Sequence, residues 1–272
     1  MPFNKGEKMP ETNDFKVFVF FNDTFSGHAE LKYAANIAKH LNSPLTILIP
    51  DSLETAILFA KNSKYCVREI LEIAQKRISE KVSSLINACL QISYEVVPDD
   101  LNLLNSDKTI FVSNSIISEQ NNFSVIAPFN EAGLLERGPG EIMIPFGNGE
   151  SGIFAATKAL PLIKRLGLNV VFWHTTWKNP ALIANEPEQH MIEDAKSVLK
   201  TIREKADELG IKHRSVIETA DDVVEGMLRF ALKEHLVLIV MTRGKKTGEG
   251  RYGDRLIKRS SPIPIFMAGR GA

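Results

Sequence analysis

The segment IMIPFGNGESG, residues 142–152, joins an apolar run to a glycine turn that could bind a dinucleotide. Gly147, Gly149 and Gly152 have the spacing G-x-G-x-x-G, which lets backbone amides approach a pyrophosphate between a strand and a helix. A dinucleotide site also needs a carboxylate at the end of the next strand, where it binds the ribose. That strand ends FWHTTWKN, which contains no acidic residue, and Glu150 in the turn would repel a pyrophosphate. The pattern therefore argues against an NAD or FAD site.

The same turn retains the features of a simpler anion site. Gly147 and Gly149 permit positive φ and a close approach of the backbone. The amides of residues 149–152 begin a predicted helix, and the N-terminus of a helix favours an anion. The alternative is a turn without a ligand, in which Ser151 caps the helix. The sequence leaves both interpretations open.

A second glycine-rich stretch follows the apolar run that ends at Met241. It combines four glycines with four cationic side chains, namely Gly244, Gly248, Gly250, Gly253, Arg243, Lys245, Lys246 and Arg251. In an open parallel sheet the binding crevice lies beyond the carboxyl ends of the strands, where the strand order reverses. This loop and the 147–152 turn are therefore expected to form one pocket. Its arginines could bind phosphate bidentately, or the loop could be a solvated basic turn.

The six histidines do not form a metal-binding pattern such as H-E-x-x-H. His190 lies three and four residues before Glu193 and Asp194, which is typical of one solvated face of a helix. His174 ends an apolar strand near the expected pocket, where a structural hydrogen bond is favoured over contact with a ligand. The histidines therefore indicate no metal site.

Motifs for hydrolysis or phosphoryl transfer do not occur in the sequence, which lacks both G-x-S-x-G and G-x4-G-K-[ST]. Asp221 and Asp222 precede VVEGMLRFALKEH and are predicted to cap a helix. Cys66 and Cys89 form no C-x-x-C pair and are expected to be buried free thiols. The chain is therefore expected not to be an enzyme.

An internal repeat sets the positions of these motifs. The segment that begins at Phe15 aligns with the segment that begins at Glu141, at one offset and without a gap. The matching residues at this offset (146 − 21 = 125) are Phe21 with Phe146, Ser26-Gly27 with Ser151-Gly152, Lys39 with Lys164, and Leu41 with Leu166. Each half of the chain is therefore predicted to open with a strand, a turn and a helix.

The rest of each half is predicted to alternate strands and helices. In the second half the expected strands are 141–146, 169–176, 212–218, 236–242 and 263–268, and the expected helices are about 151–166, 187–209, 221–235 and 253–260. In the first half the expected strands are 15–21, 44–49, 92–97, 108–113 and 123–128, with a long helical stretch from about 52 to 90. Runs such as LVLIVM and NVVFW are apolar throughout, which predicts a mostly parallel sheet covered by helices on both faces.

The composition sets outer limits on function. The 272 residues are 44% hydrophobic, and 33 basic residues balance 33 acidic ones, so no excess charge favours nucleic acid or an anionic membrane. The polar N-terminus and the lack of a long apolar run predict a cytoplasmic protein. The predicted organisation is a disordered tail, a first domain, a linker and a second domain, at residues 1–13, 14–129, 130–140 and 141–272.

In these features the chain resembles the universal stress proteins, as a tandem of two domains. The segments that carry the resemblance are IMIPFGNGES, VVFWHTT, LVLIVMTRG and GRYGDRLIKRSSPIPIFM. The resemblance implies an α/β fold of the adenine-nucleotide alpha-hydrolase-like (Rossmann-like) type. Each domain would hold a five-stranded parallel sheet of order 3-2-1-4-5, and the two domains would pack together as a pseudo-dimer.

The resemblance also implies a function, which is a non-catalytic role in the stress response with a nucleotide or other anion bound in the second domain. ATP or AMP would be the nucleotide, and the expected ligand-binding residues are Gly147, Asn148, Gly149, Thr175, Thr242, Arg243, Gly244, Gly248, Gly250 and Arg251. Two of these depart from the nucleotide-binding members of the family. Gly147 stands where those members carry an Asp, and Arg251 stands where a Ser or Thr follows the last glycine of their motif. The first domain has Asn22 at the Asp position and lacks the glycine motif, so it is expected to be structural.

Two other functions remain open at this point. The basic loop could serve slow nucleotide hydrolysis through Lys245 or Lys246, or the chain could be a scaffold whose pocket is filled by Arg243 or Trp177. A regulatory protein partner is expected, but the sequence does not indicate which protein it is. The predicted edge strands at 123–129 and 263–269 could pair within one chain or between two chains as a homodimer.

Overall fold

The structure of the chain is a computed structural model. It describes residues 15–20, 25–50, 76, 79–80, 82–83, 92–97, 109–113, 124–127, 140–147, 150–177, 187–242, 252, 255–256 and 263–268. Most of the predicted 52–90 helix, most of the 253–260 helix, both cysteines and the 1–13 tail lie outside these residues.

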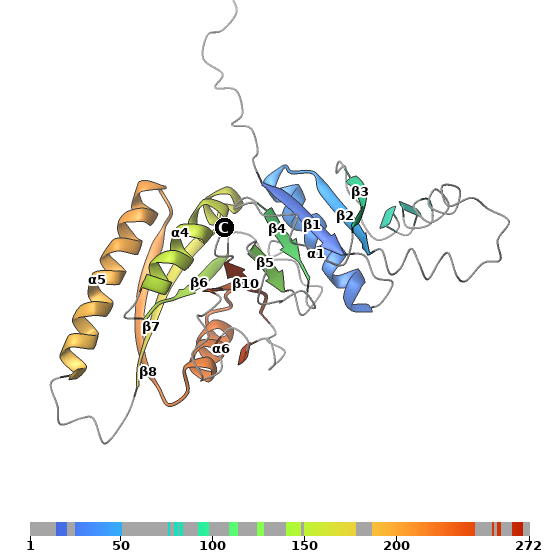
Figure 1. The fold of residues 1–272 in the computed structure, drawn as a ribbon. Coiled ribbons are helices and arrows are strands. Elements are labelled where there is room, and N and C mark those ends of the chain that lie inside the picture. Colours follow the sequence, from blue (N-terminus) through green and yellow to red (C-terminus); the bar gives the residue numbers. More distant parts are fainter. Residues whose placement is uncertain are drawn as a thin grey trace, which may run out of the picture.

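Strands and helices alternate from residue 141 to residue 242, and the described residues of the first half form five labelled strands and the helix α1 (Figure 1). The strands are β1 (Lys16–Phe20), β2 (Leu45–Pro50), β3 (Ile92–Val97), β4 (Thr109–Val112), β5 (Ser124–Ala127), β6 (Glu141–Pro145), β7 (Asn169–Trp177), β8 (His213–Ala220), β9 (Leu238–Thr242) and β10 (Ile265–Ala268). The helices are α1 (Phe25–Leu41), α4 (Glu150–Leu166), α5 (Pro187–Glu208) and α6 (Val223–Lys233).

The strands form one ten-stranded sheet with the order β3-β2-β1-β4-β5-β10-β9-β6-β7-β8. Counted within its own half, each set of five strands has the order 3-2-1-4-5, as the resemblance implied, and neighbouring strands within a half are parallel. The two halves join through β5 and β10, which pair antiparallel with Ile126 opposite Phe266 (Figure 1). The predicted edge strands therefore pair within one chain.

The internal repeat holds in three dimensions without a gap. Adding the offset of 125 to β1, Lys16–Phe20, gives 141–145, which are the bounds of β6 (141 − 16 = 125). The same offset carries α1, Phe25–Leu41, onto 150–166, which are the bounds of α4. The sequence match therefore reflects two equivalent strand-turn-helix units.

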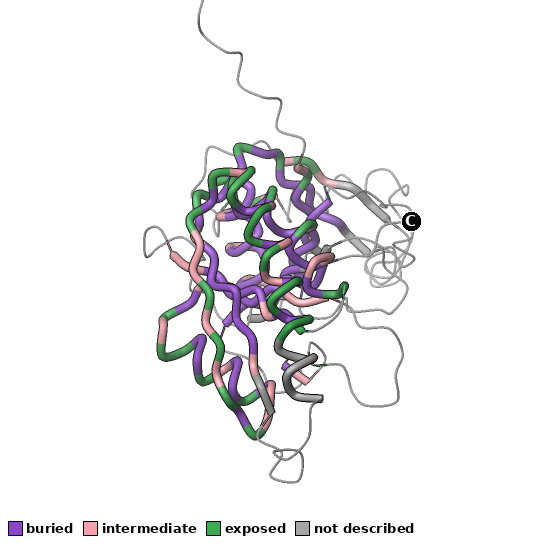
Figure 2. Tube along the Cα trace, turned by 90° about the vertical axis from the view of Figure 1, so that its left-hand side faces the viewer, coloured by how far each residue is buried: buried purple, intermediate pink, exposed green. Residues whose placement is uncertain are grey.

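Helices cover both faces of the sheet, and the core on one face runs through both halves. Alternate residues of β7 face opposite sides: Val170 and Phe172 belong to the cluster packed by α1, α4 and α5, whereas Val171 and Trp173 belong to the cluster packed by α6. The first cluster contains residues of β1 as well as β6, so the halves share it. Figure 2 shows the buried residues gathered along the strands and on the inner sides of the helices.

Helix α6 is shorter than the predicted 221–235 for two local reasons. Asp222 has extended backbone angles and acts as the N-cap, with its side chain accepting a hydrogen bond from the amide of Glu225, so the helix begins at Val223. At the other end Glu234 is the C-cap, and His235 has a φ of 54°, a left-handed conformation that ends a helix. The prediction that Asp222 caps a helix is confirmed.

Candidate functional site

The carboxyl ends of β6 and β7 bring two of the predicted ligand-binding residues to the same level. Pro145 is paired with Trp173, and the amide of Phe146 donates to the carbonyl of Trp173 at 2.9 Å. Continued by two residues, this register places Gly147 beside Thr175. Both residues follow the buried part of their strands, at the edge where parallel strands end together.

The carboxyl end of β9 brings a third predicted residue to this edge. Strand β9 pairs with β6 through Met143 and Ile239, and the same register places Thr242 level with Phe146. Strand β6 lies between β9 and β7, and its own connection through α4 leads only to β7. The strand order therefore reverses between β6 and β9, which is the position of the ligand crevice in open parallel sheets.

The glycines of the G-x-G-x-x-G segment have different environments. A Cβ atom placed on Gly147 would meet nothing within 4 Å, and this residue is exposed. Its φ is not left-handed, so the backbone there does not require glycine, and the effect of the glycine is to leave space beyond β6. A Cβ on Gly152 would lie 2.8 Å from the Cβ of Phe146, so Gly152 allows α4 to pack closely on the end of β6.

His174 has the structural role that was favoured from the sequence. Its Nδ1 lies 2.8 Å from the backbone carbonyl of Phe146, which can only accept, so Nδ1 carries the proton. The ring also stacks on the Phe146 ring, with 5.1 Å between the centroids, and is buried. His174 thereby fixes the segment that leads into the glycine turn.

The N-terminus of α4 begins with an acidic residue. The helix starts at Glu150. Ser151, which the sequence suggested as its N-cap, therefore lies inside the first turn. The free amides of a first helical turn attract an anion, and the exposed Glu150 carboxylate supplies one negative charge there. A bound phosphate would therefore need further cations beside α4.

The chain re-enters the described residues close to the same edge after the basic loop. Arg255 forms an ion pair with Asp222, which follows β8 and caps α6. The amide of Glu225 and, after it, the Arg255 guanidinium hold the pKa of Asp222 below its usual range. No local pattern in the sequence indicates Arg255, because this contact joins residues far apart in the chain.

The remaining predicted site residues, Asn148, Gly149, Arg243, Gly244, Gly248, Gly250 and Arg251, lie outside the described residues, as do Lys245 and Lys246. Their part in ligand binding stays a prediction. What the structure contributes is the position of the loop ends, because Thr242 and Arg255 both lie at the carboxyl edge of the sheet.

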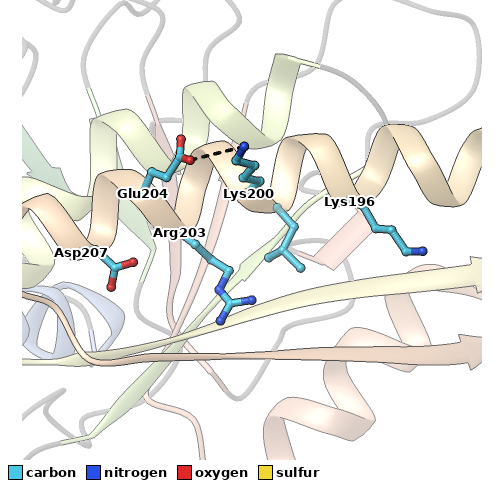
Figure 3. A pocket seen from close by; sticks show the side chains of 6 residues that line it. Lys196, Lys200, Arg203, Glu204 and Asp207 are labelled. Carbon is cyan, nitrogen blue, oxygen red and sulfur yellow. Dashed lines mark ion pairs between the residues drawn. The ribbon is translucent and has the colours of Figure 1, made fainter.

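A shallow hollow of about 360 Å³ lies along α5 and is distinct from this edge. Its lining residues all belong to that one helix: Lys196, Leu199, Lys200, Arg203, Glu204 and Asp207 (Figure 3). Asp207 binds His213, the first residue of β8, so this end of α5 lies at the amino ends of the strands. Its three basic side chains are offset by two acidic ones, and Lys200 is 3.9 Å from Glu204, which leaves little net charge for an anion.

Among the described residues, no group of three or more His, Cys, Asp or Glu side chains could hold a metal ion. His190 belongs to α5, and Glu193 and Asp194 on the same helix are exposed, which agrees with the solvated face expected for them. Within the part of the chain that the structure describes, no helix is long and apolar enough to cross a membrane.

Comparison with solved structures identifies the fold. No family model matches the sequence, and no curated protein matches it. The structure is similar to a universal stress protein from Archaeoglobus fulgidus, with a TM-score of 0.66 and 13% identity, over 96% of this chain and 100% of that one. It is also similar to a functionally unknown protein from Pseudomonas aeruginosa PAO1, with a TM-score of 0.52 and 15% identity, over 94% and 92% of the two chains. The chain therefore has the α/β fold of universal stress proteins, with two parallel five-stranded sets in tandem.

Proposed function

We propose that the chain is a cytoplasmic tandem universal stress protein, non-catalytic, whose second half binds an adenine nucleotide such as ATP or AMP, or another phosphate-bearing anion. Three findings support the family: the tandem fold, the gapless repeat and the sequence segments that resemble the family. Because fold alone does not establish function, the ligand is argued from the site.

The observation that carries the proposal is the convergence at the carboxyl edge of β6, β7 and β9. Gly147 lies beside Thr175, and Thr242 lies one residue lower on the other side of β6, at the reversal of strand order. Open space adjoins Gly147, so a ligand can approach the backbone there. The four cations of the basic loop are carried by a segment whose flanks, Thr242 and Arg255, lie at this edge.

The electrostatics favour a phosphate over a neutral ligand. The first turn of α4 offers backbone amides, and Arg243 and Arg251 can each bind phosphate oxygens bidentately. These two arginines would offset the Glu150 carboxylate and replace the Ser or Thr hydroxyl of other nucleotide-binding members with direct charge. We expect the affinity for the nucleotide to fall steeply as the salt concentration rises. The attraction between charges, which salt screens, would here replace directed hydrogen bonds.

The test is calorimetric titration of ATP, AMP and inorganic phosphate into the purified full chain, after mass spectrometry of any small molecule that it releases. One nucleotide bound per chain, weakened at least tenfold in the Arg243→Glu/Arg251→Glu variant, would support the site. The matched control is Lys212→Glu, which makes the same type of charge reversal. Lys212 is exposed and precedes β8, so it lies at the amino ends of the strands, away from the proposed site.

Two outcomes would contradict the proposal. Equal weakening by Lys212→Glu would mean that net charge, not this site, governs binding. No heat from any of the three ligands at millimolar concentration would favour the ligand-free scaffold. The same preparations test the catalytic alternative, since ATP hydrolysis that is abolished by Lys245→Ala or Lys246→Ala would show an enzyme.

A further inference from the structure

Strand β8 is a long open edge of the sheet. It spans eight residues, His213–Ala220, and among the strands that the structure describes it pairs only with β7. Its register with β7 is continuous from His213 to Ala220, without a bulge. Its sequence, HRSVIETA, contains neither the proline nor the lysine that commonly protect an edge strand from pairing with another chain.

One side chain on this edge is apolar and exposed. Alternate residues of β8 face opposite sides of the sheet. Val216 packs against the core under α6, whereas His213 has the opposite parity and binds Asp207 of α5. Ile217 lies on the same side as His213 but is 55% exposed, so α5 does not cover it. Ser215, between Val216 and Arg214 in the sequence, is also exposed on that side.

We propose that β8 pairs antiparallel with β8 of a second copy of this chain, about a two-fold axis at Val216. Arg214 lies two residues before the axis and Glu218 lies two residues after it. Each Arg214 would therefore face the partner's Glu218, which gives two ion pairs on one side of the joined sheet. On the other side, each Ile217 would face the partner's Ser215 and lie diagonal to the partner's Ile217.

The placement of charge favours this register over the one whose axis lies one residue later. An axis one residue later, at Ile217, would place Val216 opposite the partner's Glu218 and Arg214 opposite the partner's Ala220, so both ion pairs would be lost. Moving the axis by one residue shifts the antiparallel register by two residues, so every cross-strand pair changes. The complementary placement of Arg214 and Glu218 therefore favours the Val216 axis over its neighbour.

Both charged side chains are held in place before association. Arg214 donates through Nε and Nη2 to Glu141, with distances of 3.1 and 2.8 Å, and through Nη2 to Glu234 at 3.0 Å. Among the described residues Nη1 forms none of these bonds, and the side chain is 39% exposed. Glu218 accepts from Trp173 Nε1 at 3.4 Å.

The proposal is independent of the nucleotide site, because β8 contains none of the predicted ligand-binding residues. In this two-fold dimer the free edge of each β8 would be paired, so no further copy could add to it. Two ten-stranded sheets would then be joined edge to edge. It also differs from the β5–β10 junction, which is made inside each chain.

The test is the molar mass of the full chain by sedimentation equilibrium, without ligand, compared with the variant Ile217→Lys. We expect the wild-type chain to have twice the mass of one chain, and the variant to have the mass of a single chain, because two lysines would meet across the axis. The matched control is Leu232→Lys on α6, where Leu232 is 49% exposed, and this variant should remain a dimer. Circular dichroism of each variant verifies that it is folded.

The register is tested by Val216→Cys under mild oxidation, with the wild-type chain as the control for Cys66 and Cys89. Residues that face each other across an antiparallel pair are close enough for a disulfide, so a covalent dimer is expected in this variant alone. A monomeric wild-type chain at about 100 μM, a concentration well above an ordinary micromolar Kd, would overturn the proposal. A dimer that survives Ile217→Lys without cross-linking at position 216 would overturn it as well.

Discussion

At the scale of single residues, the two described glycines of the 147–152 segment have opposite surroundings. Gly152 is enclosed by Phe146, whose Cβ and Cα would lie 2.8 and 3.2 Å from an added Cβ atom. Gly147 faces open space. The motif therefore combines one glycine that serves packing with another that keeps the end of β6 accessible.

Gly152→Ala should destabilise the fold, whereas Gly147→Ala should not. The added methyl group on α4 meets backbone and Cβ atoms that cannot rotate away, so we expect a net loss of at least about 1 kcal/mol in the free energy of unfolding, despite the better helix propensity of alanine. For Gly147→Ala the change should stay within about 0.5 kcal/mol. Urea unfolding followed by circular dichroism measures both, and equal stability of the two variants would contradict the packing role.

Tyr33 of α1 carries a buried hydroxyl group. Its side chain is 1% exposed, and its hydroxyl has no hydrogen-bond partner among the described residues. Burial raises the pKa of the phenol well above its ordinary value, so the hydroxyl stays protonated. Tyr33→Phe removes this hydroxyl and should stabilise the chain by about 1 kcal/mol in urea unfolding. Tyr94→Phe on the partly exposed β3 is the control, and destabilisation by Tyr33→Phe would mean that the hydroxyl has a partner in the folded chain.

At the scale of elements, α6 depends on a charge at its N-terminus. The Asp222 carboxylate caps the helix and pairs with Arg255, and these contacts hold its pKa below the usual range. A group whose pKa falls on folding stabilises the fold at pH values above its unfolded pKa, and this stabilisation is lost as the pH falls through the folded pKa. The contribution of Asp222 is therefore complete at neutral pH and disappears in acid.

Asp222→Ala should lower the free energy of unfolding by about 1 kcal/mol at neutral pH. The difference from the wild-type chain should shrink as the pH falls below the unfolded pKa and through the lowered folded pKa, because the wild-type carboxylate then becomes protonated. Asp221→Ala is the matched control, since Asp221 is exposed and is not the N-cap. Urea titrations at several pH values measure these differences in the free energy of unfolding. A difference between Asp222→Ala and the wild-type chain that did not vary with pH would contradict a role for the carboxylate charge.

At the scale of the whole molecule, the two halves form one structural unit. Strands β5 and β10 join them into a single sheet, and one apolar cluster contains buried residues of α1 and of α4. The junction lies in the middle of the sheet, and β3 and β8 form its ends. Loss of packing in one half should therefore lower the stability of the other half as well.

Ile47→Ala in β2 tests this coupling, because Ile47 is fully buried and lies in the first half. Both tryptophans, Trp173 and Trp177, lie in β7 of the second half, so their fluorescence reports on that half only. We expect a loss of about 2–5 kcal/mol, with coincident transitions by fluorescence and circular dichroism. A fluorescence transition that does not move would show that the halves unfold separately.

Much of the fold could be predicted from the sequence because its signals are local. Uninterrupted apolar strands such as β9 indicated burial on both faces, and the match at the offset of 125 predicted equivalent units whose bounds agree residue by residue. The C-terminal end of α6 was less predictable, since His235 ends the helix through its left-handed backbone conformation. The role of the basic loop stays a prediction, because most of its residues lie outside those that the structure describes.

The sequence by itself determined the α/β class, the tandem organisation, the strand positions and the N-cap of α6, because each follows from periodicity or from neighbouring residues. Only the tertiary structure decided which edges meet. It paired β5 with β10 inside one chain, left β8 open with Ile217 exposed, and brought Gly147, Thr175 and Thr242 to one edge. Pairing of strands distant in the sequence depends on hydrogen bonds and packing between whole elements, which local patterns do not encode.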